Sequence, residues 1–517
     1  MKTFVATALG AAMVTTALAG PAMAQTIRVH QDADIRSTDP GVNRDGNTDD
    51  VILHVVEGLV GYDKEGRPQP LLAESIDVSD DGLEYTFHLR DDVRFHNGEP
   101  LTAEDVIFSW DRFMDPETGW RCLSSFDGRI NLKVEDASAI DDMTVRFRLA
   151  APNPLFLSSL ARKDCGMTAI THRDSLNEDG TWNKPIGTGP FKLNEWRHRE
   201  YISLVKNEDY ANRGEEPNAY VGSKRPLVDE LRFVVISDPA TANAALVSGS
   251  IDIITRVPYA EVETLEAHDN IGITISPQLS PATLPLQTTD PLLSNVKMRQ
   301  AIASAIDYDQ LVAGVTYGLA EPNTSLVPIS SPFYSDVTRQ GFTYDPARTA
   351  TLLEEAGYNG ETLVLTTNKR NMPNFDAAVI AQAMLQAAGI NVEVEVVEWG
   401  VQSSQWQAGN YQLMSFSYSA RMDPVFSYEA VMGPKDEQPR KVWDDPESQE
   451  ILIQAMNEPD EEKRQALIED LHRRMVEFVP IIPLFNILST GAYRDTITGY
   501  ESSSFGGPQL WEVSKAE

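Results

Sequence analysis

The side chains that most often catalyse reactions or bind metals are histidine, cysteine and carboxylate, and this chain holds none of them in a recognised catalytic spacing. Its eight histidines are dispersed, without the H-x-x-x-H or H-E-x-x-H spacing that puts two zinc ligands on one helix face. It has no G-x-S-x-G elbow, and its glycine-rich residues 185–190 lack the Lys-Ser/Thr pair of a phosphate-binding loop. The sequence therefore predicts no metal site, no cofactor and no enzymatic activity.

Carboxylates are abundant, with 77 Asp and Glu against 43 Lys and Arg, which gives a formal net charge of -34. Such a charge repels nucleic acid and anionic membrane surfaces, and the basic residues are scattered along the chain. We therefore expect the protein not to bind nucleic acid. In so acidic a chain most carboxylate pairs are solvated surface, although a hydrolase with a carboxylate dyad stays open as an alternative.

The only two cysteines are Cys122 and Cys165, each in a loop-like stretch. Two cysteines in a chain that reaches an oxidising compartment favour a disulfide, and the alternative is two separate buried thiols.

The first residues indicate export. Lys2 precedes an uncharged run over residues 3–19, and Ala22 and Ala24 fit the small-residue rule of a signal-peptide cleavage site. We expect residues 1–24 to be a signal peptide and Gln25 to be the new N-terminus in the periplasm. No cysteine near this point offers a lipid-attachment site. An N-terminal membrane anchor is the alternative, but the run is short for a span and is interrupted by threonines.

The pattern of apolar residues predicts an α/β protein of two or three domains, because 517 residues exceed what a single core supports. Strand, helix and strand follow one another at 231–236, 241–247 and 251–254, and again at 362–366, 376–388 and 392–397. Apolar residues at helical spacing predict further helices at 51–60 and 295–315. We expect the loop 185–190 to form a hinge or a tight crossing.

Five segments carry a family resemblance, in this order and spacing over nearly the whole chain: 55–110 (VVEGLVGYDKEG through DVIFSW), 184–196 (KPIGTGPFKLNEW), 245–253 (ALVSGSIDI), 296–307 (VKMRQAIASAID) and 352–358 (LLEEAGY). Together they resemble the dipeptide, oligopeptide and nickel group of ABC-transporter solute-binding proteins, the bacterial extracellular solute-binding family 5.

The resemblance implies a type II-like periplasmic-binding-protein fold, in which two lobes joined by a hinge close on a ligand and an accessory domain is attached. It divides the chain as follows: signal peptide 1–24; lobe I 25–60, 185–275 and 485–517; accessory domain 61–184; lobe III 276–484. It also implies a monomer that captures a small molecule or short peptide and delivers it to an inner-membrane ABC permease.

Three segments correspond to ligand-contacting segments of similar proteins. The implied ligand-binding residues are Asn43, Arg44, Trp399, Tyr418, Arg421 and Asp423. Each has a structural alternative, because an arginine in a polar loop is usually solvated, Trp399 could be a core aromatic, and an Asp before Pro often caps a turn.

The sequence departs from the family pattern at Ala420, where peptide-binding relatives usually carry an Asp that pairs with the ligand's ammonium group. Arg421 follows it, so the segment presents a positive group where a negative one is usual. We therefore expect a polar, carboxylate-bearing solute, such as a short peptide or an amino-acid derivative. An opine, a sugar, a metal chelate and a role as chemoreceptor partner stay open.

Overall fold

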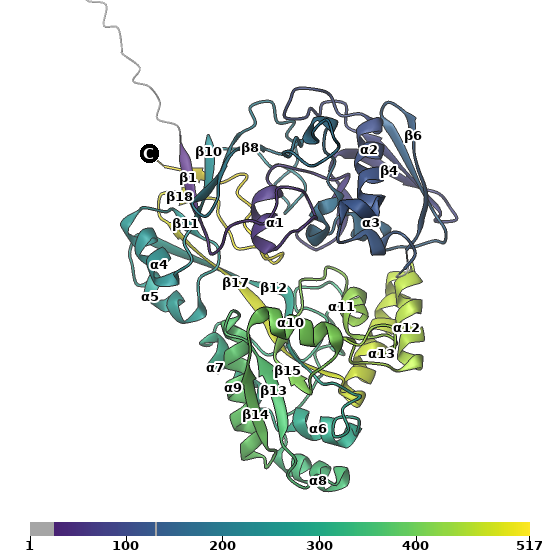
Figure 1. The fold of residues 1–517 in the computed structure, drawn as a ribbon, viewed down its shortest axis with the longest axis vertical. Coiled ribbons are helices and arrows are strands. Elements are labelled where there is room, and N and C mark those ends of the chain that lie inside the picture. The colour runs from purple at the N-terminus through teal and green to yellow at the C-terminus, as the bar shows by residue number, and fades with distance from the viewer. Residues whose placement is uncertain (1–24, 130–131, 517) are drawn as a thin grey trace, which may run out of the picture.

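The computed structural model describes residues 25–129 and 132–516 (Figure 1). The predicted signal peptide, residues 1–24, lies outside the described residues and stays a prediction. One sheet runs through the whole molecule in the order β16-β12-β17-β11-β1-β10-β9-β8. Its strands are β16 (Phe416–Ser417), β12 (Ile271–Pro285), β17 (Ile481–Arg494), β11 (Ile253–Ile254), β1 (Thr26–Gln31), β10 (Glu230–Val235), β9 (Tyr201–Lys206) and β8 (Phe191–Arg197).

Two long antiparallel strands of this sheet, β12 and β17, cross from the upper to the lower half of the molecule in Figure 1. Their pairing shifts register between Pro277 and Pro281. We call residues 25–277 and 488–516 the upper body, and residues 281–486 the lower body. The two bodies are connected by β12 and β17, and the register shift lies at the boundary between them.

The upper body contains the N-terminal part of the large sheet and a separate antiparallel sheet in the order β4-β5-β7-β6. Its other elements are α1 (Gly46–Ile52), β2 (Val60–Tyr62), β3 (Pro68–Pro70), β4 (Ala73–Val78), β5 (Glu84–Leu89), α2 (Ala103–Met114), β6 (Val134–Asp141), β7 (Thr144–Leu149), α3 (Phe156–Leu160), α4 (Pro239–Ser248), α5 (Val262–Glu266), β18 (Ile497–Thr498) and β19 (Ser514–Lys515). The two sheets share one hydrophobic core, which holds both Phe156 and Phe191. The predicted accessory domain therefore packs directly against the predicted lobe I.

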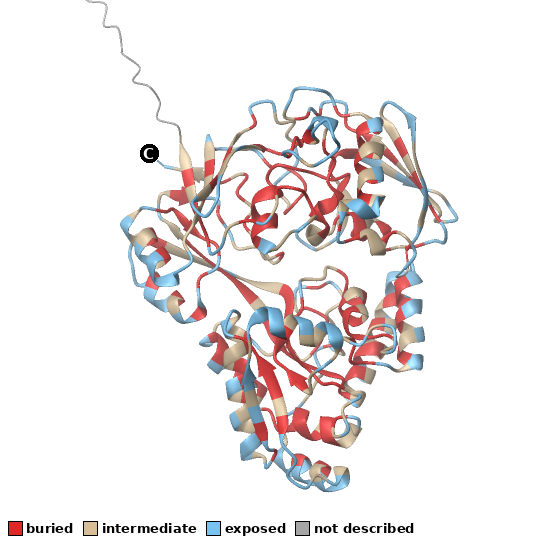
Figure 2. Ribbon diagram, viewed as in Figure 1, coloured by how far each residue is buried: buried red, intermediate tan, exposed pale blue. Residues whose placement is uncertain are grey.

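The lower body is built on a parallel sheet in the order β14-β13-β15, covered by helices. Its elements are α6 (Val296–Ser304), α7 (Tyr308–Thr316), α8 (Pro346–Ala356), β13 (Leu363–Thr367), α9 (Met372–Ala387), β14 (Val392–Val396), α10 (Trp399–Ala408), β15 (Leu413–Met414), α11 (Pro424–Val431), α12 (Pro446–Asn457) and α13 (Glu461–Phe478). Figure 2 shows buried residues gathered in the strands and on the inner helix faces, while outer helices such as α8 are largely exposed.

The helix predicted at 51–60 is wrong. The helix α1 starts earlier, where the Asp45 side chain accepts a hydrogen bond from the Thr48 amide, and it ends at Ile52. Beyond it, the carbonyl groups of His54 and Val55 accept hydrogen bonds from the amides of Phe191 and Gly189. Those carbonyls therefore pair with the loop 185–190 and its continuation instead of closing further helical turns.

The single helix predicted at 295–315 is two helices, α6 and α7. Asp307 separates them, because its side chain accepts the Gln310 amide and caps the second helix. Apolar periodicity continues through this break, since both helices contribute buried residues to the same hydrophobic core.

The loop 185–190 forms a tight crossing. A Cβ on Gly187 would lie 2.3 Å from the Val55 carbonyl oxygen, so only glycine allows the two segments to approach this closely. The break that could serve as a hinge lies elsewhere, in β12 and β17.

The two bodies touch on the side away from these strands. Leu155 of the upper body packs in a core of the lower body, and Ala420 and Met422 pack against the core of the upper body. Among the described residues, no helix is long and apolar enough to cross a membrane.

Candidate functional site

A cavity between the bodies, which we call the large chamber, has a volume of about 890 Å³. The upper body contributes residues 30–46 and 236–260 in part, the crossing strands contribute Gln278 and residues 487–490, and the lower body contributes residues near 315–317, 368–376 and 399. A volume of this size is typical of pockets for small molecules.

A second cavity, the small chamber, has a volume of about 240 Å³. It shares Arg44, Gly46 and Gln278 with the large chamber, so the two adjoin at these residues. The upper body supplies residues 162–164 and the lower body supplies residues 419–422. Both chambers therefore lie where the two bodies face each other.

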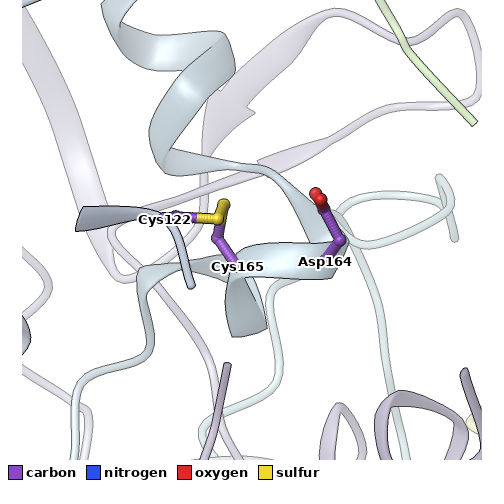
Figure 3. Close-up of side chains that lie close together, drawn as sticks. All are labelled: Cys122, Asp164 and Cys165. Atoms are coloured by element: carbon purple, nitrogen blue, oxygen red, sulfur yellow. A yellow bond between two sulfur atoms is a disulfide. The ribbon is translucent and has the colours of Figure 1, made fainter. Parts of the chain in front are cut away.

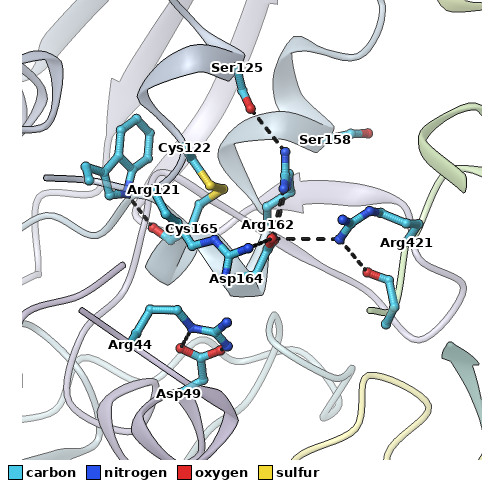
Figure 4. Close-up of a disulfide and its surroundings, with 12 residues drawn as sticks. Arg44, Asp49, Arg121, Cys122, Ser125, Ser158, Arg162, Asp164, Cys165 and Arg421 are labelled. Carbon is cyan, nitrogen blue, oxygen red and sulfur yellow. Dashed lines mark hydrogen bonds and ion pairs between the residues drawn. A yellow bond between two sulfur atoms is a disulfide. The ribbon is translucent and has the colours of Figure 1, made fainter. Parts of the chain in front are cut away.

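The small chamber carries excess positive charge. Its charged lining residues are the four cations Arg44, Arg162, Lys163 and Arg421 and the two carboxylates Asp49 and Asp164 (Figure 4 shows all but Lys163). In a chain with a formal charge of -34, a local surplus of cations is unusual. Such a chamber favours an anionic group.

The two carboxylates are already engaged by arginines. Asp49 accepts both the Nε and an Nη of Arg44. Asp164 accepts Nε and Nη2 of Arg162 at 3.1 and 2.8 Å. Burial alone would raise the pKa of Asp164, but Arg162, with Arg421 and Arg121, holds it far below its usual range. Asp164 is therefore an ionised partner of arginines.

Arg162 is compensated by Asp164, whereas the other three cations are only partly compensated, although Lys163 lies 3.5 Å from Asp50 Oδ1. Burial lowers the pKa of Arg44 to about 10, and burial also lowers the pKa values of Lys163 and Arg421. A depressed pKa of a basic group means that desolvation outweighs its attraction to nearby carboxylates. A ligand anion would supply the missing charge.

Arg421 is the least engaged of these cations. Its Nη1 lies 3.4 Å from the Ala420 carbonyl oxygen and 3.8 Å from Asp164 Oδ2, and in the described part of the chain its guanidinium makes no shorter polar contact. Lys163, by contrast, donates to the Gly506 carbonyl at 2.9 Å. Arg421 therefore has donors to spare for an incoming group.

The predicted site residues fall into two groups. Arg44 lines both chambers, Trp399 lines the large one and Arg421 the small one. Asn43 is exposed and lines neither chamber. Tyr418 is buried beside Phe416 and Trp406 and also lines neither.

Asp423 has a structural role at the edge of the site. It caps α11 by accepting the Val425 amide, and it forms an ion pair with Arg464 at 2.6 Å. This is the turn-capping role that the Asp-Pro sequence allowed. Asp423 lines a third cavity of about 530 Å³ between the bodies, which shares Met422 with the small chamber.

Sequence reasoning did not find residues 162–164 as part of the site. The structure joins Cys165 to Cys122, with Cα atoms 5.5 Å apart, and this link lies directly beside Asp164 (Figure 3). Three consecutive charged residues, Arg162, Lys163 and Asp164, stand directly before Cys165, and this pattern could have indicated them as site residues. Cys122, Cys165 and Asp164 also cluster as a metal site would, but sulfurs bonded to each other are not thiolate ligands.

Comparison with known proteins identifies the family. A family model described as bacterial extracellular solute-binding proteins, family 5 Middle, matches residues 67–438. The chain belongs to this family. Its members are binding proteins, and the mixed α/β fold of the chain is the type II periplasmic-binding-protein fold.

Relatives of this family 5 protein are similar over nearly their full length. The probable deoxycholate-binding periplasmic protein YgiS of Escherichia coli is 25% identical, covering 89% of this chain and 88% of its own. The glutathione-binding protein GsiB of Pectobacterium atrosepticum is 25% identical, covering 90% and 89%. The structure of DppA from Helicobacter pylori in complex with peptide STSA is 28% identical, covers 95% of this chain and 98% of that one, and has a TM-score of 0.79. The chain is thus a solute-binding protein of the kind that serves ABC transporters.

Proposed function

We propose that this protein is exported by its N-terminal segment to the periplasm, where it captures a small carboxylate-bearing solute and delivers it to an inner-membrane ABC permease. It works as a monomer. The division into lobe I, accessory domain and lobe III belongs to this proposal, with the register break in β12 and β17 as the hinge about which the bodies close.

The observation that carries the ligand class is the charge of the small chamber, four cations against two carboxylates. Both carboxylates are held by arginines, so a ligand ammonium group finds no free partner there, whereas an acid group finds Arg421. Arg421 lies in the lower body and Arg44 and Arg162 in the upper body, so an anion between them attracts both bodies and favours the closed state.

The names of the relatives support an acid ligand. Deoxycholate, glutathione and a peptide, the solutes named for YgiS, GsiB and DppA, each carry a carboxylate. Glutathione and STSA are both peptides, whereas deoxycholate is a bile acid with no peptide group. The shared group is the one that the small chamber suits, and we propose a short peptide or an amino-acid derivative for this chain.

The protein releases its ligand unchanged. Catalysis by a carboxylate dyad needs one carboxyl group with a raised pKa to act as an acid. In the small chamber, Asp164 has a strongly lowered pKa and Asp49 is bound by Arg44. Neither is placed to give a proton to a substrate.

The test is calorimetry of refolded protein with matched pairs of probes, each a dipeptide with a free C-terminal carboxylate and the same dipeptide as its amide. We expect the acids to bind and the amides to bind at least about tenfold more weakly, from the loss of a charge-assisted contact. Equal binding of acids and amides, or binding only of sugars or metal chelates, would contradict the acid ligand. Recovery of a cleaved probe would contradict the binding role.

A further inference from the structure

The large chamber contains unusual exposed aromatic surface. Among the described residues, the exposed aromatic side chains are Tyr317, Tyr344 and Trp399, with exposed fractions of 62%, 48% and 37%. Two of these three, Tyr317 and Trp399, line the large chamber, and the exposed Met372 lines it as well. From this concentration we infer that the ligand carries a planar aromatic group, which binds in the large chamber against Trp399 and Tyr317 while its acid group binds Arg421.

The ring of Trp399 is held in place by stacking on other aromatic rings. Its ring stacks on Phe416 with centroids 6.1 Å apart and an angle of 16° between the planes, and Phe416 stacks in turn on Trp406 at 5.0 Å and 14°. Phe416 is held in β16, where it pairs with Thr283 of β12. The indole of Trp399 is thus fixed at the end of a three-ring stack, and a planar group of the ligand would extend that stack.

Tyr317 holds a position that normally favours glycine. It ends α7 in the left-handed conformation, with φ of 55°, and the next residue is Gly318. A tyrosine at such a position costs stability that a glycine would not. Its largely exposed ring makes little packing contribution to offset that cost. A role in contacting the ligand explains its presence.

Arg370 places a cation over the Trp399 ring. Its guanidinium carbon lies 5.9 Å from the centroid of the Trp399 ring, and among the described residues no carboxylate lies within 4.0 Å of its nitrogen atoms. A guanidinium that stacks on an indole can stack on a ligand ring as well. Arg370 and Trp399 both line the large chamber, so flat groups of two kinds border it.

The two chambers adjoin at Arg44, Gly46 and Gln278, which line both, and the inference places one ligand across this junction. The inference rests on the proposed function, since it assigns the acid end to the small chamber. The inference adds the chemistry of the other end of the ligand, which lies in the large chamber. An aromatic group there covers the exposed rings of Trp399 and Tyr317, whereas an aliphatic acid leaves them in contact with water.

The test compares N-benzoyl-glutamate with N-acetyl-glutamate, two acids that differ in the aromatic group. In calorimetry we expect the benzoyl compound to bind wild-type protein about tenfold more tightly. In Trp399→Ala this preference should disappear, so that the two compounds bind within about twofold of each other. The matched control is Tyr344→Ala, an exposed aromatic outside both chambers, which should keep the preference.

Equal binding of the two acids by wild-type protein would overturn the inference alone. So would a preference that survives in Trp399→Ala and in Tyr317→Ala. Failure of both acids to bind wild-type protein, while other solutes bind, would instead overturn the proposed acid-binding function. Circular dichroism of each variant confirms that it is folded.

Discussion

Arg421 of the lower body faces Asp164 of the upper body across the cleft, with 3.8 Å between Nη1 and Oδ2 (Figure 4). Asp164 is also bound by Arg162 and lies 3.8 Å from Arg121. Arg121 and Asp164 each stand next to a cysteine of the Cys122–Cys165 link. The link therefore fixes the upper-body wall of the small chamber, and Arg421 approaches that wall from the other side. Four predictions follow from this arrangement and from the core behind it.

Replacing Arg421 by Ala should weaken the binding of an acid ligand by about tenfold or more, because a charge-assisted hydrogen bond is lost. The dissociation constant measured by calorimetry checks this. Arg473→Ala is the matched control, since Arg473 is an exposed arginine of the lower body that pairs only with Glu469 among the described residues. An unchanged dissociation constant in Arg421→Ala would show that the anchor lies elsewhere.

Replacing Asp164 by Asn separates the two possible ends of the ligand. If the chamber binds an anion, removal of the competing carboxylate leaves Arg421 without its partner across the cleft, and affinity rises. If Asp164 instead received a ligand ammonium group, affinity would fall. The same variant should lose about 2 kcal/mol of unfolding free energy, because the charge-assisted hydrogen bonds from Arg162 to this partly buried carboxylate are weakened. Calorimetry and denaturant titration measure the two effects separately.

The Cys122–Cys165 link should leave no titratable thiol in the unfolded protein when no reductant is present. Two reactive thiols would contradict it. The cysteines are 43 residues apart, so the chain-entropy model gives about 4 kcal/mol of stabilisation. Cys122→Ser with Cys165→Ser should lower the unfolding free energy by this order. The double variant should also bind acid ligands more weakly, since Arg162 and Lys163, which line the small chamber just before Cys165, lose their fixed position.

Stability should fall on acidification below pH 6.5. Burial lowers the pKa of His54 to about 4, whereas in the unfolded chain it returns to about 6.5. Between these values the unfolded state binds a proton that the folded state does not, so stability is lost as pH falls, by about 2 kcal/mol at pH 5. Denaturant unfolding at pH 7, 6 and 5 measures the slope. His54→Gln should make the slope shallower without abolishing it, because burial lowers the pKa of His96 to about 4 as well. The exposed His268→Gln should leave the slope unchanged, and equal slopes in all three proteins would contradict this.

Much of the fold could be predicted from periodicity. The strand, helix and strand around α4 and around α9 were expected within a few residues, because strands have a two-residue repeat and helices a 3.6-residue repeat. The segment after Ile52 could not be predicted in this way. Its apolar residues are buried on all sides, and its carbonyls pair with residues near Gly189, which come more than 130 positions later. Local pattern contains no information about such partners.

From the sequence, the part of the site that could be predicted best is the one that departs from the family pattern. Ala420 followed by Arg421 indicated an acid ligand, and Arg421 lies in the small chamber. Tyr418 belongs to the same segment, but its ring is buried against Phe416 and Trp406, which lie in the core of the lower body. Residues 162–164 come from a distant loop. Only the three-dimensional fold shows that they face Arg421.

The most direct test of the central claim is a crystal structure of the protein purified with the solute that it retains from the cell, supported by native mass spectrometry of the same sample. We predict an acid group of that solute within hydrogen-bonding distance of the Arg421 guanidinium, in the small chamber. An ammonium group against Asp164, or a neutral sugar bound away from Arg421, would contradict the account.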